Sequence, residues 1–237
     1  MNDTRPEIRE SHGLSYAYFE PAGGEPEAGV LILHGAGSAK ESHFDFARMC
    51  VAYGFSALAY DARGHGRSNG AWGPQAIDDA VTMLDLLRER GAPQVALRGS
   101  SMGGFSAILA AARDGRAAAV AAICPAPEDL LLRGLRSGKL DGFTADAEAL
   151  HPWLENHVNL RTAAASLAPH TALLLMHAQG DEQVPYTVSQ ELYDAAGRPK
   201  RLLLLPGGHH RSLQHDLEMQ AETVRFITRA VRGELGT

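Results

Sequence analysis

The chain is poor in cysteine, with only Cys50 and Cys124 among its 237 residues. Two cysteines cannot form the disulfide framework of a small secreted domain, so a reducing cytoplasm is the expected compartment. No apolar run approaches the length of a membrane span, and the polar start at residues 1–6 has no hydrophobic signal region. We therefore expect a cytoplasmic protein without a membrane partner.

Excess positive charge and repetitive sequence are also missing. The formal net charge is −6, which argues for solubility and against nucleic acid as a partner. There are no internal repeats and no low-complexity segments. With 45% apolar residues, the chain is long enough for one α/β domain with a full core, and we expect residues 1–237 to form a single domain.

Short apolar runs alternate with helical patterns along most of the chain. Strands are expected at residues 14–19, 30–33, 56–60, 94–98, 119–123, 173–176 and 202–205, and helices near 40–53, 74–90, 105–112, 188–196 and 213–231. Strands that alternate with helices predict a mostly parallel sheet with helices on both faces. The predicted class is therefore a doubly wound α/β fold.

The segment 125–169 interrupts this alternation. It is too long for a plain crossover and is rich in leucine. We interpret it as a small helical lid inserted in the domain, whose Trp153 and Leu154 would line a substrate pocket. The alternative is an ordinary helical crossover with a long loop.

The most informative motif is Gly99-Ser100-Ser101-Met102-Gly103, which has the form G-x-S-x-G. It lies where an apolar run ends and an alanine-rich helix begins. A serine on a sharp strand-to-helix turn exposes its hydroxyl above the sheet, beside the free N–H groups of the helix N-terminus. This combination suits acyl transfer, because a nucleophile then lies next to donors that stabilise an anion.

A serine nucleophile needs a base, and the base needs an acid to orient it. Asp181 follows the predicted strand 173–176, at the sheet edge where sites form in such folds. A glycine-rich loop with two histidines, His209 and His210, follows the strand 202–205. Either imidazole could reach over the sheet edge. The chain order serine, aspartate, histidine matches one large class of hydrolases.

Four motifs together resemble the α/β-hydrolase fold family, over nearly the whole chain. Besides the serine turn, they are the H-G-x-G run at 34–37, the D-x-R-G-x-G-x-S turn at 61–68, the acid loop at 180–185 and the P-G-x-x-H loop at 206–210. Within that family, the chain resembles the small bacterial serine hydrolases grouped with dienelactone-hydrolase-like and prolyl-oligopeptidase-like proteins. The dienelactone hydrolases use cysteine as nucleophile, where this chain has Ser101.

The resemblance implies Ser101 as nucleophile, Asp181 as acid and a histidine as base. The family's loop places the base four residues after the proline, which favours His210 over His209. The backbone N–H groups of Ala36 and Met102 are the implied oxyanion donors. Some members carry the acid after the preceding strand, which here is near Glu128 or Asp129.

Neither a metal nor another cofactor is expected. The histidines at 209, 210 and 215 match no zinc signature, and no H-E-x-x-H run is present. The glycine-rich stretch 64–73 has neither a P-loop pattern nor G-x-G-x-x-G spacing after a strand, so nucleotide binding is not supported. We expect His34 to be a buried structural histidine, and Asp61 and Arg63 to shape their turn.

The expected function is hydrolysis of small carboxylic esters through a Ser101–His210–Asp181 triad and an acyl-enzyme, with a small-molecule acyl substrate as partner. An aminopeptidase or amidase and a thioesterase are alternatives on the same triad. A non-catalytic ligand-binding member of the fold is an alternative from another class. The sequence does not indicate the natural substrate or the oligomeric state.

Overall fold

The computed structural model describes residues 6–22, 24–138 and 142–236. Its strands are β1 (Glu7–Ser11), β2 (Leu14–Phe19), β3 (Gly29–Leu33), β4 (Ser56–Tyr60), β5 (Val95–Ser100), β6 (Ala119–Ile123), β7 (Ala172–Ala178) and β8 (Lys200–Leu205). Its α-helices are α1 (Phe44–Ala52), α2 (Ala76–Glu89), α3 (Met102–Asp114), α4 (Glu128–Arg136), α5 (Ala147–Asn156), α6 (Leu160–Ser166), α7 (Thr187–Ala195), α8 (Ser212–His215) and α9 (Leu217–Val231). A short 3₁₀ helix, η1 (Lys40–His43), precedes α1.

The eight strands form one sheet in the order β1-β2-β4-β3-β5-β6-β7-β8. Pairing is parallel from β4 through β8, whereas β1 and β2 are antiparallel to their neighbours. The prediction of a mostly parallel, doubly wound sheet is confirmed. The strand β1 was not predicted, and the last predicted helix is divided into α8 and α9.

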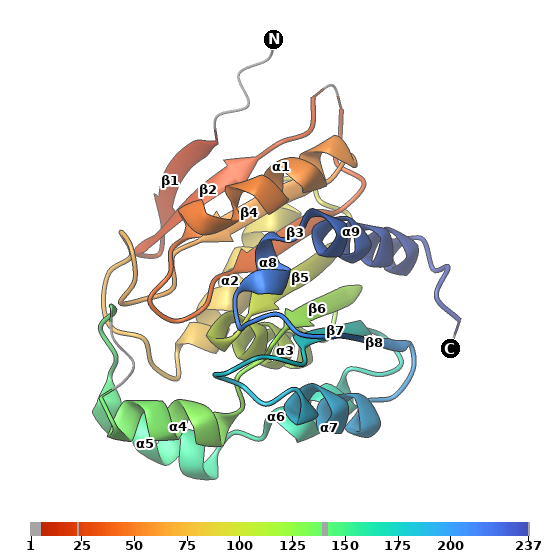
Figure 1. The fold of residues 1–237 in the computed structure, drawn as a ribbon. Helices are drawn as coiled ribbons and strands as arrows, with labels where there is room; N and C mark the ends of the chain where they lie inside the picture. Colours follow the sequence, from red (N-terminus) through yellow and green to blue (C-terminus); the bar gives the residue numbers. More distant parts are fainter. Residues whose placement is uncertain (1–5, 23, 139–141, 237) are drawn as a thin grey trace.

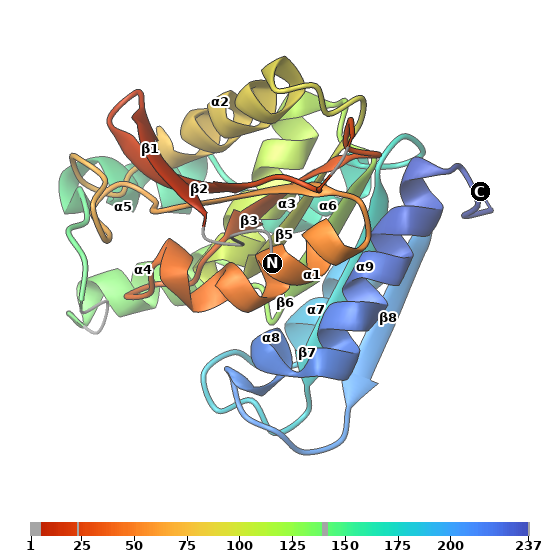
Figure 2. The ribbon, with the colours of Figure 1, turned by 90° about the horizontal axis from the view of Figure 1, so that it is seen from above.

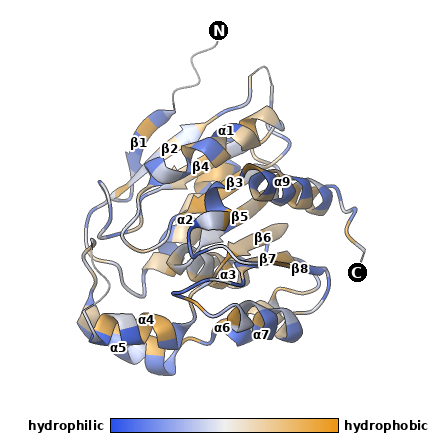
Figure 3. Ribbon diagram, viewed as in Figure 1, coloured by the Kyte–Doolittle hydropathy of each residue, from blue (hydrophilic) through white to orange (hydrophobic). Residues whose placement is uncertain are grey.

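Helices cover the sheet on both faces, as Figures 1 and 2 show. Alternate residues of the strands pack against α1 and α9 on one face and against α2, α3 and α6 on the other, which gives two separate cores. The inner strands are buried on both faces, so they are mainly apolar (Figure 3), although β5 also carries the buried Arg98. Within the described residues, no helix is both long and apolar enough to cross a membrane.

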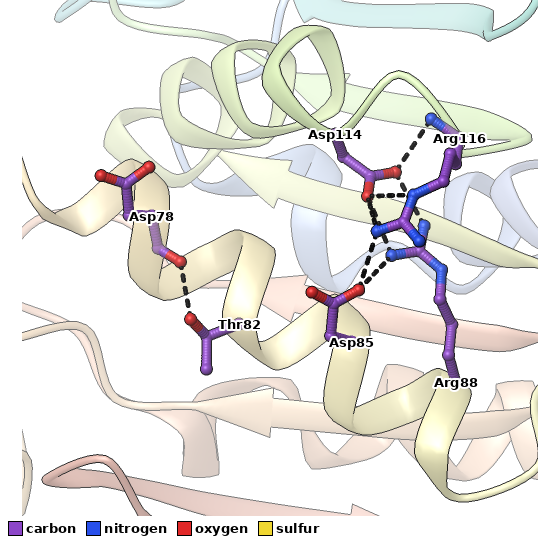
Figure 4. A network of polar contacts seen from close by, with 6 residues as sticks. All are labelled: Asp78, Thr82, Asp85, Arg88, Asp114 and Arg116. Atoms are coloured by element: carbon purple, nitrogen blue, oxygen red, sulfur yellow. Dashed lines mark hydrogen bonds and ion pairs between the residues drawn. The ribbon is translucent and has the colours of Figure 1, made fainter.

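A network of charged side chains joins α2 to the end of α3 (Figure 4). Arg88 donates two hydrogen bonds to the Asp114 carboxylate, at 2.8 and 2.7 Å, and a third to Asp85 at 2.8 Å. Arg116 also donates to Asp85 and Asp114. The paired, two-point geometry of arginine and carboxylate holds the two helices in register on this face of the sheet.

The segment 125–169 contains three helices, and its residues 139–141 lie outside the described part of the chain. Helix α6 packs against α3 and α7, so it serves as the crossover helix between β6 and β7. Helices α4 and α5 pack against each other and lie beyond the sheet in Figure 1. The helical content expected of a lid is therefore present in α4 and α5.

A buried ion pair fixes the connection after β3. Lys40 and Asp61 have fully buried side chains, and Lys40 Nζ lies 2.6 Å from Asp61 Oδ2. The backbone N–H groups of Lys40 and Arg67 also donate to this carboxylate, each at 2.9 Å. Burial alone would raise the pKa of Asp61, but these hydrogen bonds outweigh it and hold the pKa below its usual value.

Replacing Asp61 with asparagine is expected to lower the free energy of unfolding at pH 7 by about 3–5 kcal/mol, because the buried Lys40 loses its buried counter-charge and keeps only the half-exposed Glu41 carboxylate, at 3.1 Å, as a charged partner. A carboxylate with a depressed native pKa stabilises the fold above its unfolded-state pKa, which is about 3.9, and this contribution disappears as the pH falls further. The free energies of unfolding of the wild-type and Asp61→Asn proteins, measured by urea denaturation, should therefore come closer together in acid. For the exposed pair of Asp129 and Arg133, we expect Asp129→Asn to cost only about 0–1 kcal/mol. Equal losses of unfolding free energy in Asp61→Asn and Asp129→Asn would contradict the stabilising role that we assign to the buried pair of Lys40 and Asp61.

Candidate active site

The turn between β5 and α3 holds Ser101 in a strained conformation. Its backbone has φ 53° and ψ −120°, a region that L-residues rarely adopt. The Ser101 N–H donates to the Ile123 carbonyl at 2.9 Å, and the Ser101 carbonyl accepts from Phe105 and Ala126. The surrounding hydrogen bonds thus hold the turn in the geometry expected for an exposed nucleophilic serine.

Two glycines make this tight turn possible. A Cβ atom on Gly99 would collide with the Gly103 carbonyl, and one on Gly103 would collide with the Leu33 carbonyl and lie 2.5 Å from the His34 carbonyl. Because neither position has room for a side chain, the N-terminus of α3 lies directly against the end of β3. This contact brings the loop at 34–37 beside Ser101.

The expected oxyanion donors lie on the two elements that meet here. Met102 is the first residue of α3, where N–H groups have no partner within the helix and the helix dipole favours an anion. Ala36 lines the same two cavities as Ser101. The structure therefore brings both residues to the serine: Met102 lies on α3, and Ala36 lies on the loop that follows β3, where these two elements meet.

Asp181 and His210 come together from the loops after β7 and β8. The distance from His210 Nδ1 to Asp181 Oδ2 is 2.7 Å, and both side chains are almost fully buried. The other carboxylate oxygen accepts the N–H groups of Gln183 and Val184, at 2.8 and 2.9 Å. Burial would raise the pKa of Asp181, but hydrogen bonds from His177, His210 and these backbone groups hold it well below its usual value.

The alternatives for base and acid take other partners. His209 is exposed, and its side-chain Nδ1 accepts the backbone N–H of Arg211 at 3.3 Å. Glu128 accepts the N–H of Leu160, and Asp129 forms its ion pair with Arg133. In the described structure, Asp181 and His210 are thus the acid and imidazole that pair with each other.

A second imidazole contacts Asp181, and the sequence reasoning missed it. His177, in β7, has a fully buried side chain whose Nε2 lies 3.3 Å from Asp181 Oδ2 and 3.0 Å from the Val184 carbonyl. Its Nδ1 lies 2.7 Å from Ser189 Oγ. The available signal was a histidine that directly continues the apolar run 173–176, since a buried polar side chain needs partners.

His34 and its surroundings are structural, as expected. His34 Nε2 accepts the Ala62 N–H at 3.0 Å, so Nδ1 carries the proton and donates to the Gly35 carbonyl at 2.8 Å. Burial lowers the pKa of His34, which keeps the ring neutral. Arg63 donates to both oxygens of Asp79, which anchors the turn after β4 to α2.

Two cavities meet at Ser101. The larger, of about 860 Å³, is mainly lined by apolar groups of α4 and its surroundings, including Ala126, Leu130 and Leu131. The smaller, of about 130 Å³, is lined by polar residues and by His210; the polar residues are Ser38, Ser42, Ser100, Gln183, Gln214 and His215. Ser101, Ala36, Gln183 and Arg211 line both cavities.

The placement of Trp153 and Leu154 differs from the expectation. Trp153 lines a separate cavity of about 900 Å³ between α2, α3, α5 and α6, and its ring packs edge-on against Phe105. Leu154 is buried in the core. Neither lines the described cavities at Ser101, because the α5 face that carries them packs inward; α4 supplies the side chains at the cleft instead.

Among the residues that the structure describes, one cluster offers metal-ligand atoms. Those of Cys124, His177 and Asp181 lie within 4.8 Å of one another. Both polar side chains already take part in hydrogen bonds, and burial raises the pKa of the Cys124 thiol, which keeps it protonated. The donor set thus suits a hydrogen-bonded network better than a bound cation.

Comparison with known proteins identifies the fold. The family model described as "Serine aminopeptidase, S33" matches residues 24–133. The solved structure of Est1E from Butyrivibrio proteoclasticus superposes with a TM-score of 0.75 at 18% identity, over 96% of this chain and 99% of that one. The chain has the α/β-hydrolase fold.

Two curated proteins with similar sequences are informative in different ways. The uncharacterized protein YfhR of Escherichia coli K12 is 28% identical over 86% of this chain and 71% of its own length. Human monoglyceride lipase is 35% identical over 46% of this chain and 38% of its own length. The strand–turn–helix at Ser101 has the geometry of the turn that is called the nucleophile elbow in proteins of this fold. The matches support a hydrolase, and none of them identifies the bond that this chain cleaves.

Proposed function

We propose that this protein is a serine hydrolase that cleaves carboxylic esters through an acyl-enzyme. Ser101 is the nucleophile, His210 the base and Asp181 the acid. The observation that carries the proposal is the 2.7 Å hydrogen bond between His210 and Asp181, in a cleft that His210 shares with a strained, accessible Ser101. An oriented imidazole beside such a serine is the arrangement that activates a hydroxyl for acyl transfer.

The reaction has two stages. Ser101 Oγ attacks the ester carbonyl while His210 Nε2 takes its proton, and Asp181 stabilises the imidazolium through Nδ1–H. The N–H groups of Ala36 and Met102 bind the oxyanion, and such a donor typically contributes about 2.7–4 kcal/mol to transition-state stabilisation. The tetrahedral intermediate collapses, and His210 protonates the departing alcohol. Water then attacks the acyl-enzyme by the same route, releasing the acid and restoring Ser101.

The two cavities support different roles for the two halves of the ester. Leu130 and Leu131 of α4 give the larger cavity an apolar wall, which suits the acyl chain. Hydroxyl, amide and imidazole groups surround the smaller cavity, which suits a short, polar alcohol. In this proposal, α4 acts as the lid over the acyl side of the cleft.

An aminopeptidase or amidase is the second candidate, and one observation favours it. Glu182 lines the larger cavity, and hydrogen bonds from backbone N–H groups, including that of His210, lower its pKa. An ionised carboxylate near Ser101 could bind the free amine of a substrate. Thioester hydrolysis uses the same triad, and a non-catalytic receptor would keep the pocket without turnover.

A panel of p-nitrophenyl esters of increasing chain length, with aminoacyl p-nitroanilides beside them, tests these alternatives. We expect hydrolysis of the esters, with a chain-length optimum that reports the size of the larger cavity. Faster cleavage of the anilides, lost in Glu182→Gln, would indicate the aminopeptidase. A protein that reacts with a fluorophosphonate probe at Ser101 but turns over no ester, amide or thioester would be a receptor, and the proposed function would be wrong.

A further inference from the structure

The acid of the proposed triad has more donors than its role in holding His210 requires. Asp181 Oδ1 accepts two backbone N–H groups, and Oδ2 faces two imidazoles, His210 Nδ1 at 2.7 Å and His177 Nε2 at 3.3 Å. His177 is fully buried and does not line the described cavities at Ser101. It therefore reaches the reaction only through Asp181.

The surroundings of His177 determine which of its ring nitrogens donates. Nε2 faces the Val184 carbonyl and the Asp181 carboxylate, and both of these groups only accept hydrogen bonds. The proton of the neutral ring must therefore lie on Nε2. Nδ1 then accepts, and the Ser189 hydroxyl on α7 donates to it at 2.7 Å. Ser189 is itself fully buried, so α7 holds the imidazole in a fixed orientation.

We propose that His177 is a positioning residue that shares the Asp181 oxygen with His210 and thereby sets the pH at which His210 becomes a free base. This inference rests on the proposed triad. The polarised Nε2–H of His177, whose nitrogen lies 3.3 Å from Oδ2, offsets part of the negative charge that stabilises the His210 imidazolium. His210 therefore gives up its proton at a lower pH than it would with the carboxylate to itself. The two backbone donors on Oδ1 keep the carboxylate in place when His177 changes.

Other ionisable groups face the pair from several elements: Arg211 and His215 line the small cavity together with His210, and both stay in place in the position-177 variants. The Cys124 thiol approaches from the connection after β6, and burial keeps it protonated. The Glu182 carboxylate accepts the backbone N–H of His210 at 3.2 Å and lies at the rim of the cleft. Neither faces Oδ2 from a buried, fixed position as His177 Nε2 does at 3.3 Å, so a change at position 177 should be read out by His210.

Two matched substitutions at position 177 separate the effect of the N–H group that faces Asp181 from the effect of removing the imidazole ring. A glutamine amide at position 177 occupies the place of Nε2 and keeps a donor to Asp181, whereas an asparagine amide occupies the place of Nδ1 and does not reach it. We expect His177→Asn to move the acid limb of the kcat/KM profile to higher pH by on the order of half a unit. His177→Gln should stay close to the wild-type profile.

Ser189→Ala is the structural control, because it removes a buried hydrogen bond from the same ring but leaves Nε2 facing Asp181. It should lower the melting temperature without moving the acid limb. The proposal is overturned if His177→Asn leaves the limb in place or moves it to lower pH, or if Ser189→Ala moves it equally.

An NMR titration of the His210 ring Cε1–H signal, assigned by its loss in His210→Ala, measures the same shift without turnover. If the wild-type protein cleaved no ester, the proposed function would fail, yet this titration would still test the coupling of His177 to His210. An unchanged His210 titration midpoint in His177→Asn would overturn the coupling, whatever the enzyme's substrate.

Discussion

Ser101→Ala is expected to lower kcat for ester hydrolysis by roughly 10⁶-fold, the size of loss known for a serine protease that loses its nucleophile. The remaining machinery still binds the substrate, so KM should change little. Stability should not fall, because the strained φ of 53° does not depend on the hydroxyl. Steady-state kinetics on the preferred p-nitrophenyl ester, with circular dichroism of the variant, checks this result.

The adjacent serine provides the matched control. Ser100 is the last residue of β5, and its hydroxyl has no hydrogen-bond partner among the described residues. We expect Ser100→Ala to lower kcat less than tenfold, because Ser100 only lines the polar cavity, whereas Ser101 is proposed to form the covalent bond. A Ser101→Ala protein that kept more than about one per cent of wild-type kcat, far above the residual activity of such variants, would show that Ser101 is not the nucleophile.

His210→Ala is expected to lower kcat by a similar factor, because the base and the nucleophile act as one unit. The neighbouring His209 allows a direct comparison, since it lies one residue away on the same loop. Its ring takes a backbone N–H rather than a carboxylate, so His209→Ala should stay within about tenfold of wild type. The two variants are compared by kcat at the same pH on the same ester.

The double variant His210→Ala/Ser101→Ala extends this test. If the two side chains act together, it should be little worse than either single variant. Multiplied losses would instead mean that His210 and Ser101 contribute independently. If His209→Ala suffered the larger loss, the base would be His209 and the hydrogen bond from His210 to Asp181 would be structural.

The fold was predictable where burial imposes a simple pattern. The strands β3 to β7 are mainly apolar because both faces of the sheet are covered, with the buried Arg98 and His177 as exceptions, and the helices that follow them are amphipathic. The strand β1 escaped prediction because its sequence, Glu7–Ser11, is almost entirely exposed and three of its five residues are charged, so no apolar pattern marks it. The division between α8 and α9 depends on Asp216, whose side chain accepts the N–H groups of Glu218 and Met219 and starts a new helix.

The predictability of the candidate site followed a similar division. Ser101, Asp181 and His210 lie in glycine-rich turns directly after predicted strands, so sequence spacing brings them to one sheet edge. The contribution of His177 depends on its distance from Asp181, which no spacing rule contains. The lining of the cleft by α4 rather than by Trp153 depends on how two helices pack, and their leucines alone do not indicate which face turns inward.

The insertion between β6 and β7 has an evolutionary consequence. The three proposed triad residues lie on loops after β5, β7 and β8, whose strands are held in place by β6 and by one another. Helices α4 and α5 belong to one segment that leaves this frame after β6 and rejoins it at β7, and α4 forms a wall of the proposed acyl cavity. Exchange, lengthening or mutation of that one segment can therefore diversify substrate preference while the chemistry is inherited unchanged.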